Sequence, residues 1–172
     1  MNDRMNRPST DELSIRILRL LERRASLTID ELATMLDANP EDIARRIQHL
    51  EQTRVLVGRH ALINWEKTGE EPVSALIEVR LSPQREVGFG ATAERIARFP
   101  EARSVHLVSG TYDLAVEVTG RTMKDVANFV SEKLAPLDGV QGTTTHFLLK
   151  RYKEDGEMFD EPEPPPRLPF SP

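Results

Sequence analysis

Hydrophobic residues in the first third of the chain recur at helical spacing, and polar side chains that favour helix starts interrupt them. Thr28 followed by Glu31 fits a capping box, in which each side chain binds the other residue's backbone N–H. Asn39 followed by Pro40 supplies a capping side chain and a first-turn residue whose missing N–H costs nothing. The two helix starts lie one short turn apart within the stretch 28–50. The pattern predicts a helix-turn-helix.

The second predicted helix has one apolar face and one polar face. Its inward side chains fall at positions i, i+4 and i+7, namely Ile43, Ile47 and Leu50. The opposite face is where a DNA duplex would be read, because arginine in a recognition helix binds guanine in the major groove. With one residue from the following segment, the candidate DNA-binding residues are Asn39, Pro40, Ala44, Arg45, Arg46, Gln48, His49 and Arg59. The alternative is a solvated helix face, with Arg46 paired to Glu22 or Glu51.

Further elements are expected on both sides of this helix pair. Ser9 and Glu12 fit another capping box, which predicts a first helix that packs behind the pair. After the pair, the apolar stretches 55–57 and 60–63 predict two short strands joined by a tight turn, which form a wing. Residues 9–64 are therefore predicted to form a winged helix-turn-helix domain.

The hydrophobic period changes after a polar linker at 65–72, and the change marks a second domain at 73–153. Apolar residues alternate with polar ones from Val73 to Leu81, which predicts a strand. A helix, two strands, a second helix and a last strand are predicted at about 93–99, 104–109, 112–119, 122–137 and 140–152. This β-α-β-β-α-β order is typical of a ferredoxin-like, RAM/ACT-like antiparallel sheet with both helices on one side. The fold class is therefore α+β.

The helix-free face of the predicted sheet needs a cover, since strand residues that point there include apolar ones. The commonest cover for such a face is a second copy of the same sheet. We therefore expect a homodimer or a higher homo-oligomer.

Composition limits the classes of protein to which the chain can belong. The 172 residues contain no cysteine, which excludes disulfides, thiolate metal sites and thiol catalysis. No apolar run is long enough to cross a membrane, and residues 1–8 lack the core of a signal peptide. We expect a soluble cytoplasmic protein.

The formal net charge of −5 comes from the end of the chain. The segment 154–172 holds six acidic residues and one arginine, and it is dense in proline. A segment of this composition packs poorly, so we expect it to be disordered. Residues 1–64 hold ten basic and ten acidic residues and have no broad basic field. We expect each DNA-binding domain to bind DNA weakly and dimerisation to strengthen the binding.

Several local sequence patterns resemble the Lrp/AsnC family of feast/famine transcriptional regulators, and the similarity extends from about Ser9 to Lys153. Ile17-Leu18 corresponds to the end of the family's D-x-x-I-L pattern, although Ser14 replaces the acid. The recognition segment is present as Asn39-Pro40 and the R-I-x-x-L run at 46–50. The family's G-x-Y-D pattern is present at 110–113. The resemblance implies a dimer formed through the sheet domains and an amino acid or related metabolite bound between subunits near G-x-Y-D.

One departure from the family pattern concerns DNA affinity. Glu41 and Asp42 occupy the first turn of the recognition helix, where small hydroxyl residues are more usual in the family. Two carboxylates there favour the helix dipole but repel phosphate.

The candidate effector site combines the G-x-Y-D turn with the last strand. A phenol and a carboxylate suit the amino group of a ligand, and a threonine-rich strand offers further polar partners. The candidate effector-binding residues are Gly110, Thr111, Tyr112, Asp113, Thr144 and His146. The alternative is that the turn residues shape a hairpin and the threonines reflect β-propensity.

These features favour a sequence-specific, DNA-binding transcriptional regulator that responds to an amino acid or a related metabolite, without a cofactor. A metabolite-binding oligomeric module with little or no DNA affinity is the alternative, because the first domain is neutral. Some enzymes of tetrapyrrole decarboxylation are similar in domain order, but the four histidines of this chain are isolated and no His pair has metal spacing. We expect no enzyme activity.

Overall fold

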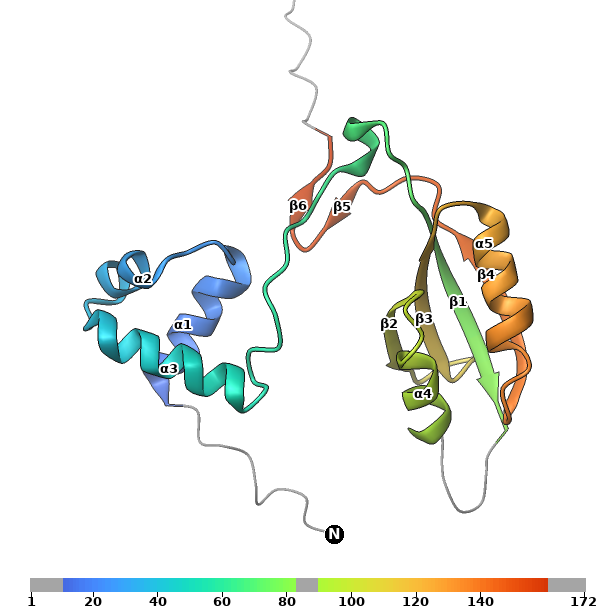
Figure 1. The fold of residues 1–172 in the computed structure, drawn as a ribbon, viewed down its shortest axis with the longest axis horizontal. Helices are drawn as coiled ribbons and strands as arrows, with labels where there is room; N and C mark the ends of the chain where they lie inside the picture. The colour runs from blue at the N-terminus through green and yellow to red at the C-terminus, as the bar shows by residue number, and fades with distance from the viewer. Residues whose placement is uncertain (1–10, 83–89, 161–172) are drawn as a thin grey trace, which may run out of the picture. The chain divides into compact units, whose positions relative to one another are not determined.

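A computed structural model describes residues 11–82 and 90–160, and the chain divides into two compact units, Met1–Ile63 and Asn64–Pro172 (Figure 1). Within residues 11–63, the first unit contains three helices: α1 (Glu12–Arg23), α2 (Ile29–Leu36) and α3 (Pro40–Gln52). The fully buried side chains of Ile17, Leu32 and Ile43 bring one residue from each helix into a common core. The three predicted helices are confirmed.

The caps of α2 and α3 form as the sequence predicts. The N–H of Thr28 donates to Glu31 Oε2 at 2.8 Å, and the N–H of Glu31 donates to Thr28 Oγ1 at 3.2 Å. The side chain of Asn39 accepts from the N–H of Glu41 at 2.7 Å. The prediction for α1 was wrong in detail, because Asp11 caps this helix; Ser9 lies outside the described residues.

The two strands predicted for the wing do not form. Residues 55–63, all of which the structure describes, contain neither helix nor strand. The N–H groups of Val55 and Leu56 both donate to the carbonyl oxygen of Leu50 at 2.9 Å. This turn at the end of α3 uses the two backbone donors that the first strand of a hairpin would need for pairing.

The second unit contains the predicted βαββαβ arrangement, preceded by a 3₁₀ turn, η1 (Trp65–Thr68), inside the expected linker. The other elements, in chain order, are β1 (Val73–Leu81), α4 (Gly90–Ala97), β2 (Ala102–Leu107), β3 (Leu114–Gly120), α5 (Met123–Asn128), its π-helical continuation η2 (Phe129–Leu134) and β4 (Val140–Phe147). The strands form an antiparallel sheet in the order β2-β3-β1-β4. The ferredoxin-like fold class is confirmed.

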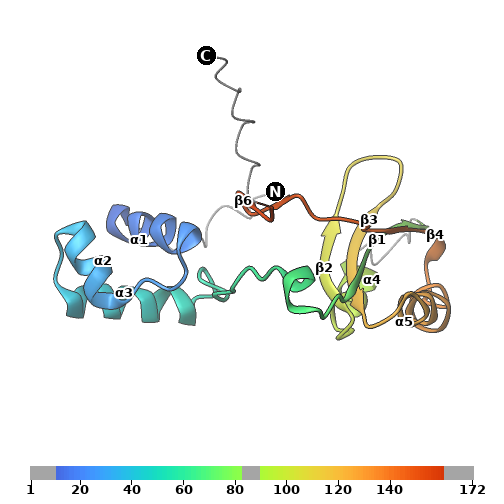
Figure 2. The same ribbon diagram turned by 90° about the horizontal axis from the view of Figure 1, so that it is seen from above.

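Both helices of the second unit lie on the same side of the sheet (Figure 2). Alternate β1 residues, including Ile77 and Val79, are fully buried and pack with Ile96, Phe129 and Leu134 from the helices. The period-two pattern of β1 therefore correctly predicts which side chains enter the core.

The helix-free face of the sheet is more polar than the sequence suggested. Register places Glu78 of β1 beside Thr144 of β4, and Leu76 beside Glu117 of β3. Leu76 is one of few large apolar residues of β1 and β3 whose side chains point to the helix-free face. The other large apolar side chains of these strands point to the helices.

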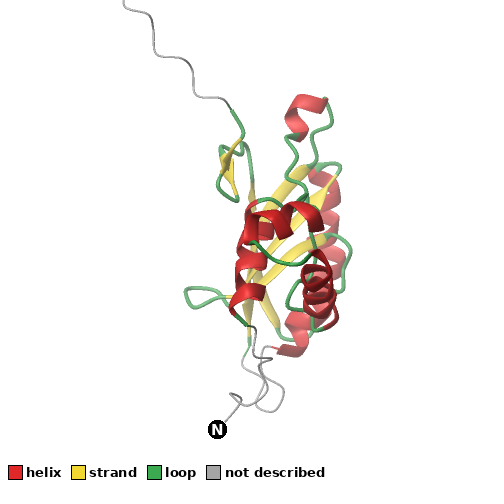
Figure 3. Cartoon of the chain, turned by 90° about the vertical axis from the view of Figure 1, so that its left-hand side faces the viewer, coloured by secondary structure: helices red, strands yellow, loops and turns green. Residues whose placement is uncertain are grey.

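The end of the second unit differs from the predicted long strand and disordered tail. β4 ends at Phe147, and a separate hairpin follows, formed by β5 (Lys153–Glu154) and β6 (Glu157–Met158) (Figure 3). Asp155 and Gly156 have φ angles of 48° and 90°, the left-handed pair that a tight Asp-Gly hairpin turn requires. The tail residues 161–172 lie outside the described residues.

Candidate nucleic-acid interface and ligand site

The turn between α2 and α3 is closed by backbone hydrogen bonds. Asp37 adopts a left-handed conformation with φ 51° and ψ 52°, at the position where helices often have glycine. The N–H of Ala38 donates to the carbonyl oxygen of Ala33 at 3.0 Å, which is the six-to-one bond of a Schellman motif. This turn sets the direction in which α3 leaves α2.

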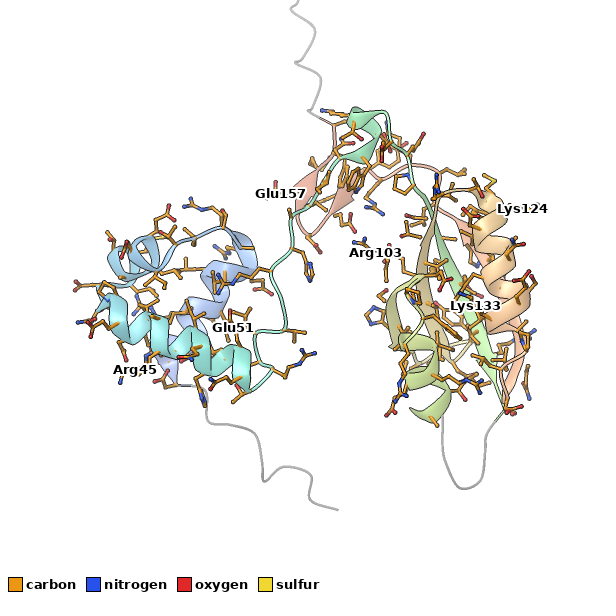
Figure 4. All side chains as sticks on the ribbon, in the orientation of Figure 1. Arg45, Glu51, Arg103, Lys124, Lys133 and Glu157 are labelled. Atoms are coloured by element: carbon orange, nitrogen blue, oxygen red, sulfur yellow. The ribbon has the colours of Figure 1, made fainter. Side chains whose placement is uncertain are left out.

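The outer face of α3 presents exposed polar side chains. Arg45 is 75% exposed and points away from the helical core (Figure 4). Gln48 and His49 are exposed on the same helix, and Ala44 is partly exposed. Arg45 forms an ion pair with Asp42 at 2.7 Å, but an exposed pair of this kind costs little to break. The Arg45 guanidinium is therefore available to an incoming duplex.

Arg46 has different surroundings from its neighbour. Its side chain is 27% exposed and pairs with Asp42 at 2.9 Å and with Asp11, the N-cap of α1. Hydrogen bonds from the Ser14 N–H, the Ser14 hydroxyl and Arg46 lower the pKa of Asp11 to about 2. Arg46 thus joins α3 to the start of α1, and the predicted partners Glu22 and Glu51 were wrong.

Carboxylates accompany most of the cationic candidates. Asp42 contacts both Arg45 and Arg46, and Glu51 forms an ion pair with Arg59 at 2.9 Å. Asn39 and Pro40 lie at the start of α3, where the amide of Asn39 is occupied as the helix cap. The acidic residues that the sequence places on this helix therefore neutralise part of its positive charge.

The G-x-Y-D segment lies between β2 and β3. The Asp113 carboxylate accepts a hydrogen bond from the N–H of Leu81 at 2.7 Å, and the N–H of Asp113 donates to the carbonyl oxygen of Val79 at 3.0 Å. Asp113 therefore terminates β1 as well as lying at the candidate ligand site. Gly110 and Thr111 are exposed, and Tyr112 is half-buried.

The other candidate effector residues lie farther along the sheet. Thr144 pairs with Glu78 and His146 pairs with Leu76 in the register of β1 and β4. His146 Nε2 lies 3.2 Å from Glu78 Oε1, with both side chains on the helix-free face. The structure therefore groups Thr144, His146 and Glu78, while Asp113 is fixed at the end of β1.

Two of these functional neighbours were missed by sequence reasoning. Asp11 carries no pattern that connects it with Arg46, because the two residues meet only when α1 packs on α3. Glu78 is one of the polar positions in the alternating stretch from Val73 to Leu81, and its contact with His146 depends on the register between β1 and β4.

Comparison with known proteins identifies both units. Residues 74–158 match the Lrp/AsnC ligand binding domain, and residues 10–57 match a winged helix-turn-helix DNA-binding family. The chain is 43% identical over 162 residues to the HTH-type transcriptional regulator YugG of Bacillus subtilis, covering 94% of this chain and 98% of that protein. It is 28% identical to the leucine-responsive regulatory protein of Rhizobium meliloti, covering 86% of this chain and 94% of that one.

A solved structure gives the same result for the fold. The complex of a transcriptional regulator of Neisseria meningitidis with L-methionine aligns at 26% identity and a TM-score of 0.63, covering 84% of this chain and 92% of that one. A helix-turn-helix joined to a ligand-binding sheet domain defines a DNA-binding transcriptional regulator. The chain belongs to the Lrp/AsnC family, and the matched family and relatives are transcriptional regulators, not enzymes.

Two further observations concern the described residues alone. Residues 11–82 and 90–160 contain no group of three His, Asp or Glu side chains arranged to hold a metal ion. Within the same residues, no helix has the length and apolar character needed to cross a membrane.

Proposed function

We propose that this regulator binds the major groove of DNA with the outer face of α3, as a homodimer or higher homo-oligomer, and that an amino acid or related small molecule controls it. The observation that carries the proposal is the exposed face of α3, where Arg45, Gln48 and His49 project from a helix held by its cap and by Arg46. Such a regulator acts in the cytoplasm, where the chromosome of a bacterium or archaeon lies.

The proposed DNA contacts have different roles. Arg45, Gln48 and His49 contact base edges or phosphates, and Ala44 allows close approach of the helix. Asn39 and Pro40 place the positive end of α3 near a phosphate, and Arg59 follows the adjacent backbone. Arg46 acts mainly as the scaffold that orients α3, because its guanidinium is held by two carboxylates.

The amino-acid effector is supported by the relatives. One solved relative is a complex with L-methionine, and one sequence relative is a leucine-responsive regulator. In this chain the proposed contacts are Gly110, Thr111, Tyr112 and Asp113 of the turn, with Thr144 and His146 of β4. A second copy on the helix-free sheet face would bring polar residues of two chains together at this region.

A second candidate function is a metabolite-binding module with little DNA affinity. The specific observation in its favour is that Asp42 engages both arginines of α3 and Glu51 engages Arg59. Duplex phosphates would have to compete with these carboxylates for each cation.

Selection from a random library of double-stranded oligonucleotides tests the proposal against this alternative. The proposal predicts enrichment of a two-fold symmetric sequence with half-sites about one helical turn apart. Absence of any enriched sequence at low salt would favour the metabolite-binding module.

The effector is tested separately by adding each of the twenty amino acids to the full chain in a calorimeter. Binding of at least one, with a change in oligomer size or DNA affinity, supports amino-acid control. Heats equal to dilution for all twenty would contradict it.

A further inference from the structure

The connection between the two units has an anchored part and an unanchored part. α3 ends at Gln52 and β1 begins at Val73, so residues 53–72 connect them. Residues 55–63 form neither helix nor strand and are mostly exposed. Asn64 is the first residue of the second unit and is half-buried. What holds Asn64 therefore decides how much of the connection is free.

The segment 148–160, here called the C-terminal strap, leaves the last strand of the sheet and folds back on itself. The N–H of Leu148 donates to the carbonyl oxygen of Ser74 on β1 at 2.9 Å, which ties the start of the strap to the sheet. Within the strap, the N–H of Phe159 donates to the carbonyl oxygen of Tyr152 at 3.1 Å. The hairpin of β5 and β6 closes the loop between these two residues.

Arg151 connects the strap to the sheet. Its guanidinium pairs with Glu154 at 2.7 Å and lies 3.9 Å from Glu117 on β3. The same guanidinium lies 5.8 Å from the centre of the Phe159 ring. One half-buried side chain thus connects the sheet, the hairpin and the residue at the end of the strap.

The end of the strap holds the start of the second unit. Asn64 Nδ2 donates to the carbonyl oxygen of Phe159 at 3.1 Å, across 95 positions of sequence. Figure 1 shows the β5–β6 hairpin beside the chain that leads into η1. A hydrogen bond between segments so distant in sequence requires both to be in fixed positions.

Charges along the same two segments are complementary. Lys150 and Asp160 form an ion pair at 2.9 Å inside the strap. Asp160 and then, more weakly, Tyr152 and Glu66 of η1 raise the pKa of Lys150. Lys150 and then Lys67 of η1 lower the pKa of Asp160. Glu66 and Lys67 of η1 therefore favour the charged forms of Lys150 and Asp160, respectively.

We propose that the C-terminal strap anchors the connection at Asn64, so that only residues 57–63 act as the tether of the DNA-binding unit, since backbone hydrogen bonds hold residues 53–56 to the end of α3. Without the strap, the tether extends to residue 72, where β1 begins. The span of a flexible segment grows with the square root of its length, so this change lengthens the tether by about a half. A shorter tether narrows the range of positions from which two DNA-binding units of an oligomer reach their half-sites. The inference goes beyond the proposed function and concerns its geometry.

Distance measurement between the two units tests the anchor. The chain has no cysteine, so single cysteines introduced at the exposed residues Glu22 and Lys124 carry the only spin labels. Dilution with excess unlabelled chain ensures that the measured pairs come from one chain. Asn64→Asp replaces the amide donor with an oxygen that faces the Phe159 carbonyl, with almost no change in shape. Arg151→Gln releases the strap at a second point.

The expected result is a distribution of label distances that is broader by about a half in both variants than in the parent chain. The matched control is Glu157→Gln on β6 (Figure 4), whose side chain makes no ion pair with the described residues. It should leave the distribution unchanged. Equal widths for the parent, Asn64→Asp and Arg151→Gln, with native thermal unfolding, would overturn the proposal. No DNA or effector is present, so this failure would leave the proposed function intact.

Discussion

At the residue scale, Arg45 and Arg46 are neighbours with separate roles. Arg45 is three-quarters exposed with one weak partner, whereas Arg46 is largely covered and joins α3 to the cap of α1. Affinity for DNA and stability of the first unit should therefore respond to different substitutions. Each of the two substitutions serves as the control for the other.

Arg45→Ala should weaken DNA binding by about 1–3 kcal/mol and leave the free energy of unfolding within about 0.5 kcal/mol of the parent. Arg46→Ala should lower the free energy of unfolding by about 1–3 kcal/mol, because it removes the hydrogen bonds from one guanidinium to Asp42 and Asp11 that join α3 to α1. Urea unfolding and fluorescence anisotropy measure the two quantities. Equal loss of stability in both variants would show that the division of roles is wrong. The double variant should lose DNA retardation and keep its oligomer size.

Asp113 is a second residue with two roles to separate. Asp113→Ala should lower the free energy of unfolding by about 1–3 kcal/mol, because the N–H of the buried Leu81 loses its acceptor. Asp113→Asn keeps an oxygen for that N–H but removes the charge, so it should fold normally and lose effector binding. Thermal unfolding and calorimetry distinguish the two roles. An unchanged binding heat in Asp113→Asn would place the ligand elsewhere.

At the element scale, the turn before α3 depends on the left-handed backbone of Asp37. A β-branched residue is strained in this conformation, so Asp37→Val should destabilise the first unit by about 1–2 kcal/mol. Asp37→Gly, the control, should be at least as stable as the parent and therefore more stable than Asp37→Val. Glycine adopts this conformation without strain. If valine and glycine give the same urea midpoint, the turn does not constrain α3.

The start of α1 predicts a dependence of stability on pH. Because the pKa of Asp11 falls from 3.8 to about 2 on folding, its contribution is fully present above pH 3.8 and is lost as the pH falls towards 2. Asp11→Asn can still cap the helix but does not titrate. The difference in thermal midpoint between the parent and Asp11→Asn should therefore shrink between pH 4 and pH 2. A constant difference across this window would contradict the assignment.

Local signals in the sequence were sufficient for some elements and insufficient for others. The caps at Thr28 and Asn39 involve residues two or three positions apart, so their side-chain types alone predict the helix starts. The prediction of the wing was wrong because apolar alternation does not reveal that the Leu50 carbonyl oxygen accepts hydrogen bonds from the N–H groups of Val55 and Leu56. The hairpin at Asp155-Gly156 carried a turn signal, but acidic and proline-rich surroundings favoured disorder.

The candidate sites depend even more on distant contacts. Helical spacing correctly predicts that Arg45, Gln48 and His49 are exposed, because it determines which side chains of α3 share a face. Their contact with DNA stays a prediction. The partner of Arg46, the contact between Glu78 and His146, and the bond from Leu81 to Asp113 each join separate elements. Periodicity says nothing about such pairs, because packing and strand register set them.

At the scale of the whole molecule, the proposed homo-oligomer would compensate for the low basic charge of each DNA-binding unit. The first 64 residues carry equal numbers of acidic and basic residues. In the proposed dimer, two DNA-binding units linked through their sheet domains would gain affinity from their effective concentration, without new contacts. Dilution of the protein below its dimerisation range should therefore weaken DNA binding more steeply than a single-site curve. Analytical ultracentrifugation at the same concentrations checks the oligomer.

The most direct test of DNA recognition by α3 is a titration of the selected duplex, followed by anisotropy, at several salt concentrations. The account predicts that affinity falls as salt rises, and that Arg45→Ala weakens binding at every salt concentration while His146→Ala does not. If Arg45 contacts a phosphate, its loss should also reduce the slope of log affinity against log salt by about one. Binding that is independent of salt, or identical in the parent and Arg45→Ala, would contradict recognition through the outer face of α3.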